Sequence, residues 1–379
     1  MQEDFHYYAT YCAAYIAGYG HEKSMEIAYS AQFVDCLSET LLRKLKGPLH
    51  AATTQTQPEL MNARTDIIGL QNITRIWASF HFLPYDLYAT FHKKRPKIYM
   101  DKYRLICKPN GILVTDTVKN AENKGTQAIG IAMHVLADTW AHSYFAGTPS
   151  NVINNTNYHF YEIIDNEEKK IEFRHNPSQP DDVINGLYSN SLHQEGEYSI
   201  MNLGHGRAGH LPDYSFIKYK YLPAWGDYEE IIKDNQAEYY NAFCQMVYAL
   251  EYLKGDYEEF KLDTYAYDSV LPWESEIRAI IERRQSIASD DWKAFGEKLS
   301  GEFIEDFDIQ KYQDEYVKAG KDQKGETFLG KYFVAALSQK SMVTNRIFKS
   351  KNRLAGFSKD YIGGKFAGIK DFKSLISNS

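Results

Sequence analysis

Three side chains that commonly ligate metals recur at helical spacing within residues 125–146 (GTQAIGIAMHVLADTWAHSYFA). His134, Asp138 and His142 follow one another at intervals of four residues, so an α-helix would place them within one sector of about 80°. Their neighbours are mostly apolar, and a buried His or Asp must find a partner. A carboxylate flanked by two imidazoles is typical of a divalent-metal site. A hydrogen-bonded His–Asp–His network in the core is the alternative.

Further residues of the same types occur before and after this segment. The run GHGRAGHLPD (204–213) contains His205, His210 and Asp213, and its glycines let the backbone approach a ligand closely. A Gly-rich turn with two exposed His is the alternative there. Arg207 in the same run is a candidate phosphate contact or a solvated charge. The remaining candidates are His81 in SFHFLP, Asp35 in the apolar AQFVDC, and Asp4 and His6 in DFHYY.

Common signatures of several enzyme classes are absent from the sequence. It contains no Gly-x-Gly-x-x-Gly, no Gly-Lys-Ser/Thr and no Gly-x-Ser-x-Gly motif, and His21–Glu22 lacks the second His that a zinc protease needs. None of the 12 His is followed directly by Asp, as it would be in the HD phosphohydrolases. The His and Asp residues described above therefore remain the best candidates for chemistry.

The order of the motifs QxDFHYY, AQFVD, FHFLP, HVLADTWAH and HGRAGHLPD resembles that of the zinc-dependent phospholipase C and single-strand nuclease superfamily. The members of that superfamily are all-α phosphoesterases that hold three zinc ions in a cleft. The resemblance covers residues 1 to about 215 or 250 and rests on ligand type and spacing. The same motifs also resemble an uncharacterised bacterial domain family, which supplies no function.

The resemblance implies a hydrolase of phosphoester bonds that holds two or three Zn²⁺ ions. Its substrate would be a phospholipid or a nucleotide or nucleic-acid phosphodiester, with Asp138 and Arg207 as the catalytic candidates. The implied ligands are Asp35, His81, His134 and Asp138 for the first ion; His142, Asp213 and either His205 or His210 for the second; and His6 with a shared Asp138 for the third, completed by the Met1 amino group or Asp4.

A non-catalytic, metal-stabilised binding or effector module is the alternative function. Structural zinc sites usually close with four Cys or His ligands. The candidate set here is rich in Asp and exceeds four ligands, which favours a hydrolytic centre with several metals.

Composition and charge place the chain among globular proteins with a basic C-terminal tail. Of the 379 residues, 44% are hydrophobic and 25% are charged, and the net charge is −7. Residues 316–379 contain 13 Lys and Arg against 4 Asp and Glu, whereas the preceding residues contain 30 against 46. This tail is a candidate contact for an anionic membrane or a nucleic acid.

The sequence contains no transmembrane segment, because no apolar run approaches the ~18 residues that a membrane span needs. The start MQEDFHYY lacks the layout of a secretory signal. We therefore expect a cytoplasmic protein, or one exported by a route that reads no signal peptide.

The periodicity of apolar residues predicts a mainly α fold. Asn110–Gly111 lies between two apolar runs and predicts a small β-hairpin insertion over 98–115, while 150–212 is polar and turn-rich. We expect a multi-helix, metal-binding, phosphoesterase-like domain over 1–255 and a helical C-terminal region over 256–379. The apolar face of the last helix would contact either the core or a membrane. The predicted helices are 5–17, 24–45, 59–80, 125–146, 227–254, 274–304 and 326–349.

Overall fold

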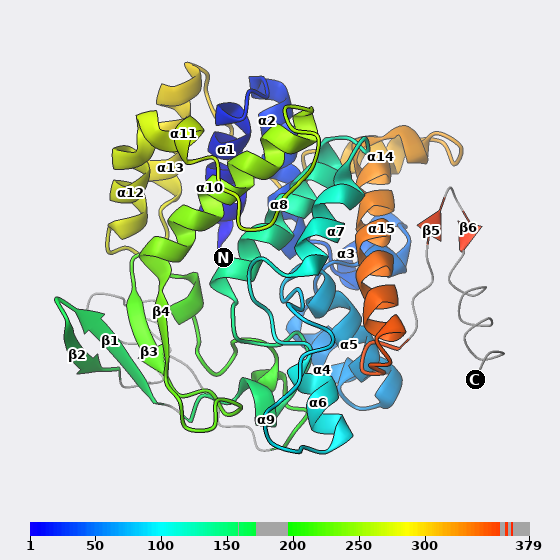
Figure 1. Cartoon of the computed structure of the whole chain (residues 1–379). Coiled ribbons are helices and arrows are strands. Elements are labelled where there is room, and N and C mark those ends of the chain that lie inside the picture. The colour runs from blue at the N-terminus through cyan, green and yellow to red at the C-terminus, as the bar shows by residue number, and fades with distance from the viewer. Residues whose placement is uncertain (158, 172–195, 357–360, 363–364, 367–379) are drawn as a thin grey trace.

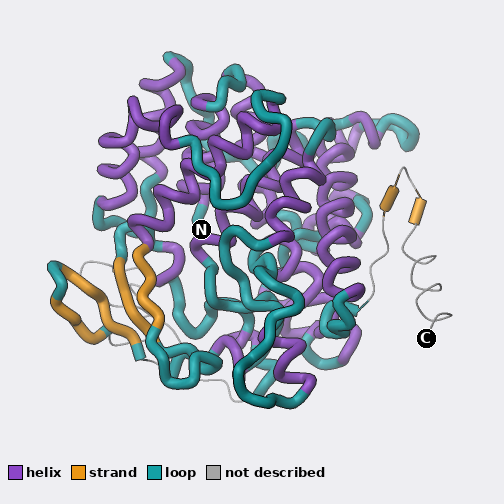
Figure 2. Tube along the Cα trace, in the orientation of Figure 1, coloured by secondary structure: helices purple, strands orange, loops and turns teal. Residues whose placement is uncertain are grey.

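The structure, a computed structural model, describes residues 1–157, 159–171, 196–356, 361–362 and 365–366. The fold is mainly helical, as predicted, with a small four-stranded antiparallel sheet at one edge and a long C-terminal helix (Figure 1). Figure 2 shows the four strands of this sheet together at that edge, beside the helices that form most of the molecule.

The helical elements before the sheet carry most of the candidate ligands. They are η1 (Asp4–Ala9), α1 (Thr10–Ile16), α2 (His21–Gln32), η2 (Phe33–Asp35), α3 (Glu39–Leu45), η3 (Leu49–Ala51), α4 (Gln57–Ala63), α5 (Ile67–Phe80), α6 (Lys97–Tyr103), α7 (Ile112–Ala121), α8 (Thr126–Ala141) and α9 (Asn151–Asn154). The later ones are η4 (Ile200–Asn202), η5 (Leu211–Asp213), α10 (Asn235–Lys254), α11 (Tyr267–Val270), η6 (Leu271–Trp273), α12 (Glu274–Glu282), α13 (Ser289–Ser300), α14 (Gln313–Lys318), η7 (Lys324–Glu326) and α15 (Phe328–Lys349).

Helix α8 is the centre of the fold. Every residue from Gln127 to Ala141 is buried, as expected of a helix that is apolar on all sides. Helices α2, α5, α7, α10 and α15 all pack against it. At Gly130 an added Cβ would lie 2.4 Å from the Ile27 carbonyl oxygen, so this position requires glycine for α2 to approach α8 closely.

The sheet is made of strands β1 (Phe160–Ile164), β2 (Glu167–Lys170), β3 (Lys218–Tyr221) and β4 (Ile231–Asp234), in the order β2-β1-β3-β4. All of its neighbouring strands are antiparallel. Phe160 and Tyr221 from its inner face belong to a small aromatic core with Phe82 and Phe145. The sheet therefore packs against the segments that leave α5 and α8.

The predicted β-hairpin over 98–115 is wrong in its position. Helix α6 and the start of α7 occupy these residues, and only isolated β-bridges at Ile106 and Cys107 are present there. Asn110 does make the predicted turn, with φ of 61°, but the turn leads into a helix because Leu113 and Val114 are buried in the main core. The strands lie between residues 160 and 234 instead.

Two of the predicted helices are each divided into two α-helices. The 24–45 segment becomes α2 and α3, joined by the short element η2, and the 59–80 segment becomes α4 and α5. Ser38 and Asp66 start the second helix of each pair, since their side chains accept hydrogen bonds from the backbone N–H groups of Leu41 and Gly69. Each break follows from a capping residue within an otherwise helical pattern.

The C-terminal helix belongs to the core. The apolar face of α15 is buried against α5, α7 and α8 and belongs to the same hydrophobic cluster as Phe5 and Leu136, so this face is not available to a membrane. Beyond it, β5 (Tyr361–Ile362) pairs with β6 (Lys365–Phe366), and most of the basic tail after residue 356 lies outside the described residues. None of the described helices combines the length and hydropathy that a membrane crossing requires.

Candidate metal centre

Three groups of His and Asp side chains meet at the C-terminal half of α8. They are His6 with His134 and Asp138; Asp35 with His81 and His134; and His142 with His205 and Asp213. Within each group, the candidate ligand atoms lie within 4.8 Å of one another. The first two groups share His134, and we call the three together the Asp138 group, because the carboxylate of Asp138 lies between them.

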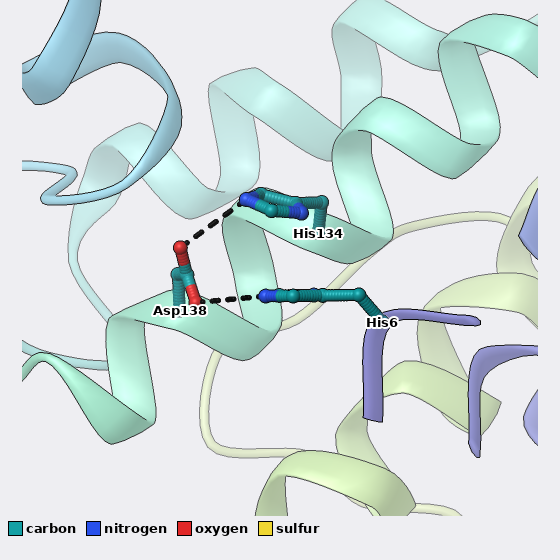
Figure 3. A group of neighbouring side chains, drawn as sticks. All are labelled: His6, His134 and Asp138. Carbon is teal, nitrogen blue, oxygen red and sulfur yellow. Dashed lines mark ion pairs between the residues drawn. The ribbon is translucent and has the colours of Figure 1, made fainter. Parts of the chain in front are cut away.

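The carboxylate of Asp138 is almost fully buried and faces four imidazoles. Its Oδ1 lies 3.2 Å from His6 Nε2. Its Oδ2 lies 3.2 Å from His134 Nε2 and 3.4 Å from both His81 Nδ1 and His142 Nδ1. In Figure 3, His134 and Asp138 project from α8 while His6 reaches them from the N-terminal segment, and each carboxylate oxygen points toward one ring.

Backbone carbonyls hold four of the histidine rings from behind. Ring nitrogens of His81, His134, His142 and His205 lie 2.8 to 3.0 Å from the carbonyl oxygens of Thr53, Ala31, His81 and Gly209, respectively. Because a carbonyl oxygen only accepts hydrogen bonds, the ring nitrogen facing it must be the donor. A neutral ring then has its lone pair on the opposite nitrogen, as in metal-ligating histidines whose second nitrogen is held by a carbonyl.

Hydrogen-bond acceptors therefore face one another between α5 and α8. His81 Nδ1 and His134 Nε2 lie 3.3 Å apart, and Asp35 Oδ1 lies 3.7 Å and 3.9 Å from them, respectively. In the neutral imidazoles both of these nitrogens carry lone pairs. Two lone pairs and two carboxylates at such separations repel one another unless a cation lies between them.

His6 lies in a different environment from the other rings. It is fully buried, it stacks on His134 with ring centroids 3.8 Å apart, and neither of its ring nitrogens makes a hydrogen bond. A buried polar atom without a hydrogen bond is rare and calls for a ligand or a strained role. His6 lies in η1, a π-helical segment, a geometry that is frequent at functional sites.

His205 and His210, the two alternative candidates in the loop 204–213, lie at different distances from the other His and Asp side chains. His205 lies with His142 and Asp213, and its Nε2 is 3.9 Å from Asp213 Oδ1. His210 is outside this group and 52% exposed, although its Nδ1 lies 3.3 Å from Asp213 Oδ2. Gly204 makes the approach of this loop possible, since an added Cβ would lie 2.1 Å from the ring of Phe82.

The two N-terminal alternatives, the Met1 amino group and Asp4, lie in different places. The nitrogen of the Met1 amino group is 2.9 Å from Asp138 Oδ1, 3.0 Å from His142 Nε2 and 3.3 Å from Asp213 Oδ1. The carboxylate of Asp4 instead accepts hydrogen bonds from the backbone N–H groups of Phe5 and Ala288. Asp4 therefore supports the chain next to His6 and is not placed among the other ligand atoms.

Burial and neighbouring charges set the protonation states of the group. Burial lowers the pKa of His6, His134 and His205 to about 4. Burial would raise the pKa of Asp138, but the His142 ring and the Met1 amino group hold it well below its usual value. Neutral imidazoles next to an ionised carboxylate are the states in which these residues bind metals.

A buried lysine holds the end of α8 that precedes His142. Lys233 Nζ, from β4, donates hydrogen bonds to the Trp140 carbonyl oxygen at 2.8 Å and to Ser143 Oγ at 2.6 Å, and it pairs with Glu238. A cation is favourable at a helix C-terminus. We call these residues the Lys233 group. The sequence alone gives no signal for the Lys233 group, because no local pattern links β4 to α8.

Arg207 is buried, and its Nε donates a hydrogen bond to Asn202 Oδ1 at 2.9 Å. This contact ties together the loop that carries His205. Its role as a phosphate contact stays a prediction.

Fold and site together define a mainly α-helical protein with a buried cluster of His and Asp at one end of its central helix. The chain belongs to a protein family of unknown function, DUF6765, whose family model matches residues 1–347. The match includes every residue of the Asp138 group. No curated protein and no solved structure matched the chain.

Proposed function

We propose that this protein is a metal-dependent hydrolase of phosphoester bonds that holds two or three divalent ions, zinc in the first place, in the Asp138 group. The proposal extends the resemblance to zinc-dependent phospholipases C and single-strand nucleases. Its substrate would be a phosphodiester of a lipid or of a nucleotide or nucleic acid.

The observation that carries the proposal is the set of acceptors between α5 and α8. His81 and His134 present lone pairs to each other and to the carboxylates of Asp35 and Asp138, while their other nitrogens donate to backbone carbonyls. A purely structural hydrogen-bond network would alternate donors and acceptors. This arrangement fits a divalent cation bound by nitrogen and oxygen ligands.

Three sets of ligands are available to such ions. The first consists of Asp35, His81, His134 and Asp138. The second consists of His142, His205 and Asp213, and the third of His6 with Asp138. When bound, divalent ions lower the pKa of water toward neutrality and offset the negative charge of phosphate oxygens.

The protein's own contribution is position and access. The carbonyl oxygens of Ala31 and Thr53 hold the rings of His134 and His81 by hydrogen bonds. The buried carboxylate of Asp138 lies within 3.4 Å of a histidine ring from each of the three ligand sets. The Asp35 side chain is 34% exposed and that of His205 is 20% exposed, so a substrate phosphate has a route to the outer ligands. The inner ligands are closed to bulk water.

A non-catalytic, metal-stabilised module is the second candidate, favoured by the deep burial of His6, His134 and Asp138. Structural metal sites are closed, whereas catalytic sites keep an open position. The partial exposure of Asp35 and His205 favours the hydrolase. A contact of the basic tail with an anionic membrane or a nucleic acid remains a separate proposal.

Hydrolysis of bis-p-nitrophenyl phosphate tests the function. We expect release of p-nitrophenol by the full-length protein, its loss after chelation, and its return when Zn²⁺ is added. Asp138→Asn should abolish this activity. Asp314→Asn, the same change at a side chain that is 86% exposed on α14, is the matched control and should leave it unchanged.

A protein that binds metal but hydrolyses no lipid, nucleic-acid or nucleotide phosphoester would support the non-catalytic module. Equal activity of the Asp138→Asn variant and the wild type would contradict the proposed site.

A further inference from the structure

A cavity of about 530 Å³ lies away from the Asp138 group, between α5, α6 and the segment that follows α15. Its lining includes the apolar side chains of Ile67, Leu70, Ile98, Pro149 and Leu354. The volume is typical of a site for a small molecule. Thr74, the residue of α5 in its lining that is nearest to His81 in the sequence, precedes it by seven residues, or about 10 Å along a helix, so this cavity and the candidate metal ligands are separate.

Hydrogen bonds between its walls show that the cavity is a defined part of the fold. Asn352 Nδ2 donates to the carbonyl oxygen of Asp101 on α6 at 2.6 Å, and Gln71 Nε2 on α5 donates to the carbonyl oxygen of Arg353 at 3.1 Å. Thr74 and Thr148 close the polar side, since their hydroxyl groups lie 3.0 Å apart and are buried. In Figure 1, α5 lies beside α15, and α6 lies near the lower end of both.

The mouth of the cavity is apolar and positively charged. Ile67 is 74% exposed and Ile98 is 55% exposed, so the mouth presents apolar surface to water, as ligand-binding grooves do. Lys97 and Arg353 are exposed members of the lining, and Lys97 ends the basic run HKKRPK (92–97). Two other charged residues line the cavity: Lys102 is paired with Glu197, and the Asp101 carboxyl group lies close enough to Lys97 and Arg353 for their charges to act on it, which leaves one carboxyl group between two cations.

We propose that this cavity binds a single-chain anionic amphiphile, with the alkyl chain between Leu70, Ile98 and Leu354 and the anionic head at Lys97 and Arg353. An apolar interior favours an alkyl chain. The two cations at the mouth favour a carboxylate or phosphate over a neutral head. The ligand is a small molecule and does not depend on the activity proposed for the Asp138 group.

Calorimetric titration of the full-length protein with hexadecanoic acid, hexadecyl phosphate and hexadecanol tests this inference, with each anion below its critical micelle concentration and the alcohol below its solubility limit. We expect saturable binding of one anion per chain and at least about tenfold weaker binding of the alcohol, which corresponds to about 1.4 kcal/mol. The tighter of the two anions identifies the head group. Equal binding of hexadecanol, or no saturable binding of either anion, would overturn the proposal.

Leu70→Trp fills the cavity, and Ile98→Trp narrows its mouth at an exposed position that tolerates substitution without loss of the fold. Each should weaken binding of the anion by about tenfold or more, whereas Ile112→Trp, at a 61% exposed isoleucine of α7, should not. Lys97→Glu should weaken the anion selectively, with Lys318→Glu on α14, 76% exposed, as its control. Unchanged binding in the Ile98→Trp and Lys97→Glu variants would contradict the site.

The metal content of the same variants separates this inference from the proposed function. It should equal that of the wild type in every cavity variant. Loss of metal binding in Asp138→Asn, with amphiphile binding retained, would show that the two sites are independent.

Discussion

The Lys233 group and the Asp138 group are two buried polar clusters at the same end of α8, and they differ in how their charges are satisfied. The ammonium of Lys233 has three oxygen partners, namely the Trp140 carbonyl, Ser143 Oγ and the Glu238 carboxylate. In the Asp138 group, the facing nitrogens of His81 and His134 have only acceptors around them. A cluster in which donors match acceptors stabilises a fold, whereas one with an excess of acceptors is suited to bind a cation.

Lys233→Met should give the largest loss of stability. It leaves the partly buried carboxylate of Glu238 without its cation and the C-terminus of α8 without a donor, so the free energy of unfolding should fall by about 3 kcal/mol. Urea denaturation measures this change. The loss should be equal with and without a chelator, and a loss that vanishes after chelation would show that the two groups are not distinct.

Asp138→Asn should give the largest loss of metal. The carboxylate is shared by the ligand sets, so its removal should lower the affinity for Zn²⁺ by at least about 100-fold, or about 2.7 kcal/mol. Competition with a chromophoric chelator measures the affinity, and Asp314→Asn is the control. Retention of the full metal content would contradict the central place of Asp138.

Gly130→Ala should affect both stability and metal binding. The added methyl group would push α2 away from α8 and lengthen the hydrogen bond from His134 to the Ala31 carbonyl. We expect a loss of about 1–3 kcal/mol in the free energy of unfolding, with weaker Zn²⁺ binding. Gly325→Ala, where the added Cβ would have no neighbour within 4 Å, should change neither quantity.

His205→Ala and His210→Ala should differ in their effect on the outer ligand set. Because His205 lies with His142 and Asp213 while His210 lies outside, His205→Ala should weaken metal binding by about tenfold, or 1.4 kcal/mol. His210→Ala should change it by less than about twofold. Metal titration of both variants measures this difference. A larger loss of metal affinity in His210→Ala than in His205→Ala would assign the ligand to His210 instead.

Lys340 is a lysine with fewer partners than Lys233. Among the described residues, its Nζ donates a hydrogen bond only to the Ala52 carbonyl, at 2.9 Å. Burial, with a smaller contribution from Arg75, lowers its pKa to about 7. Between pH 7 and 10 the unfolded chain then binds a proton that the folded chain lacks, so stability should rise with pH. Lys340→Met should flatten this rise, as measured by urea denaturation at both pH values. An identical pH dependence in the variant would contradict the assignment.

Local sequence patterns were sufficient to predict the mainly helical fold and to select the candidate ligands that lie together on α8. The spacing of His134, Asp138 and His142 follows from helix geometry, and the structure places all three in the Asp138 group. The position of Asp35 and His81 next to them depends on tertiary packing and was inferred through the resemblance. The choice between His205 and His210 was left open because both lie in one Gly-rich loop.

Other features had no local signal. The carbonyls of Ala31 and Thr53 belong to ordinary residues that only the packing of α2 and α5 brings to the histidines. The Asn110–Gly111 turn has the sequence of a hairpin, but burial of the following residues favours a helix. Lys233 lies within the helix predicted over 227–254, whereas the structure places it in β4, and its burial against the end of α8 depends on the sheet as a whole.

Elemental analysis of the purified full-length protein tests the central claim most directly. We expect two to three zinc or other divalent transition-metal ions per chain, released by a strong chelator and reduced in Asp138→Asn but not in Asp314→Asn. A chain that contains none, and that binds none when Zn²⁺ is supplied, would contradict it.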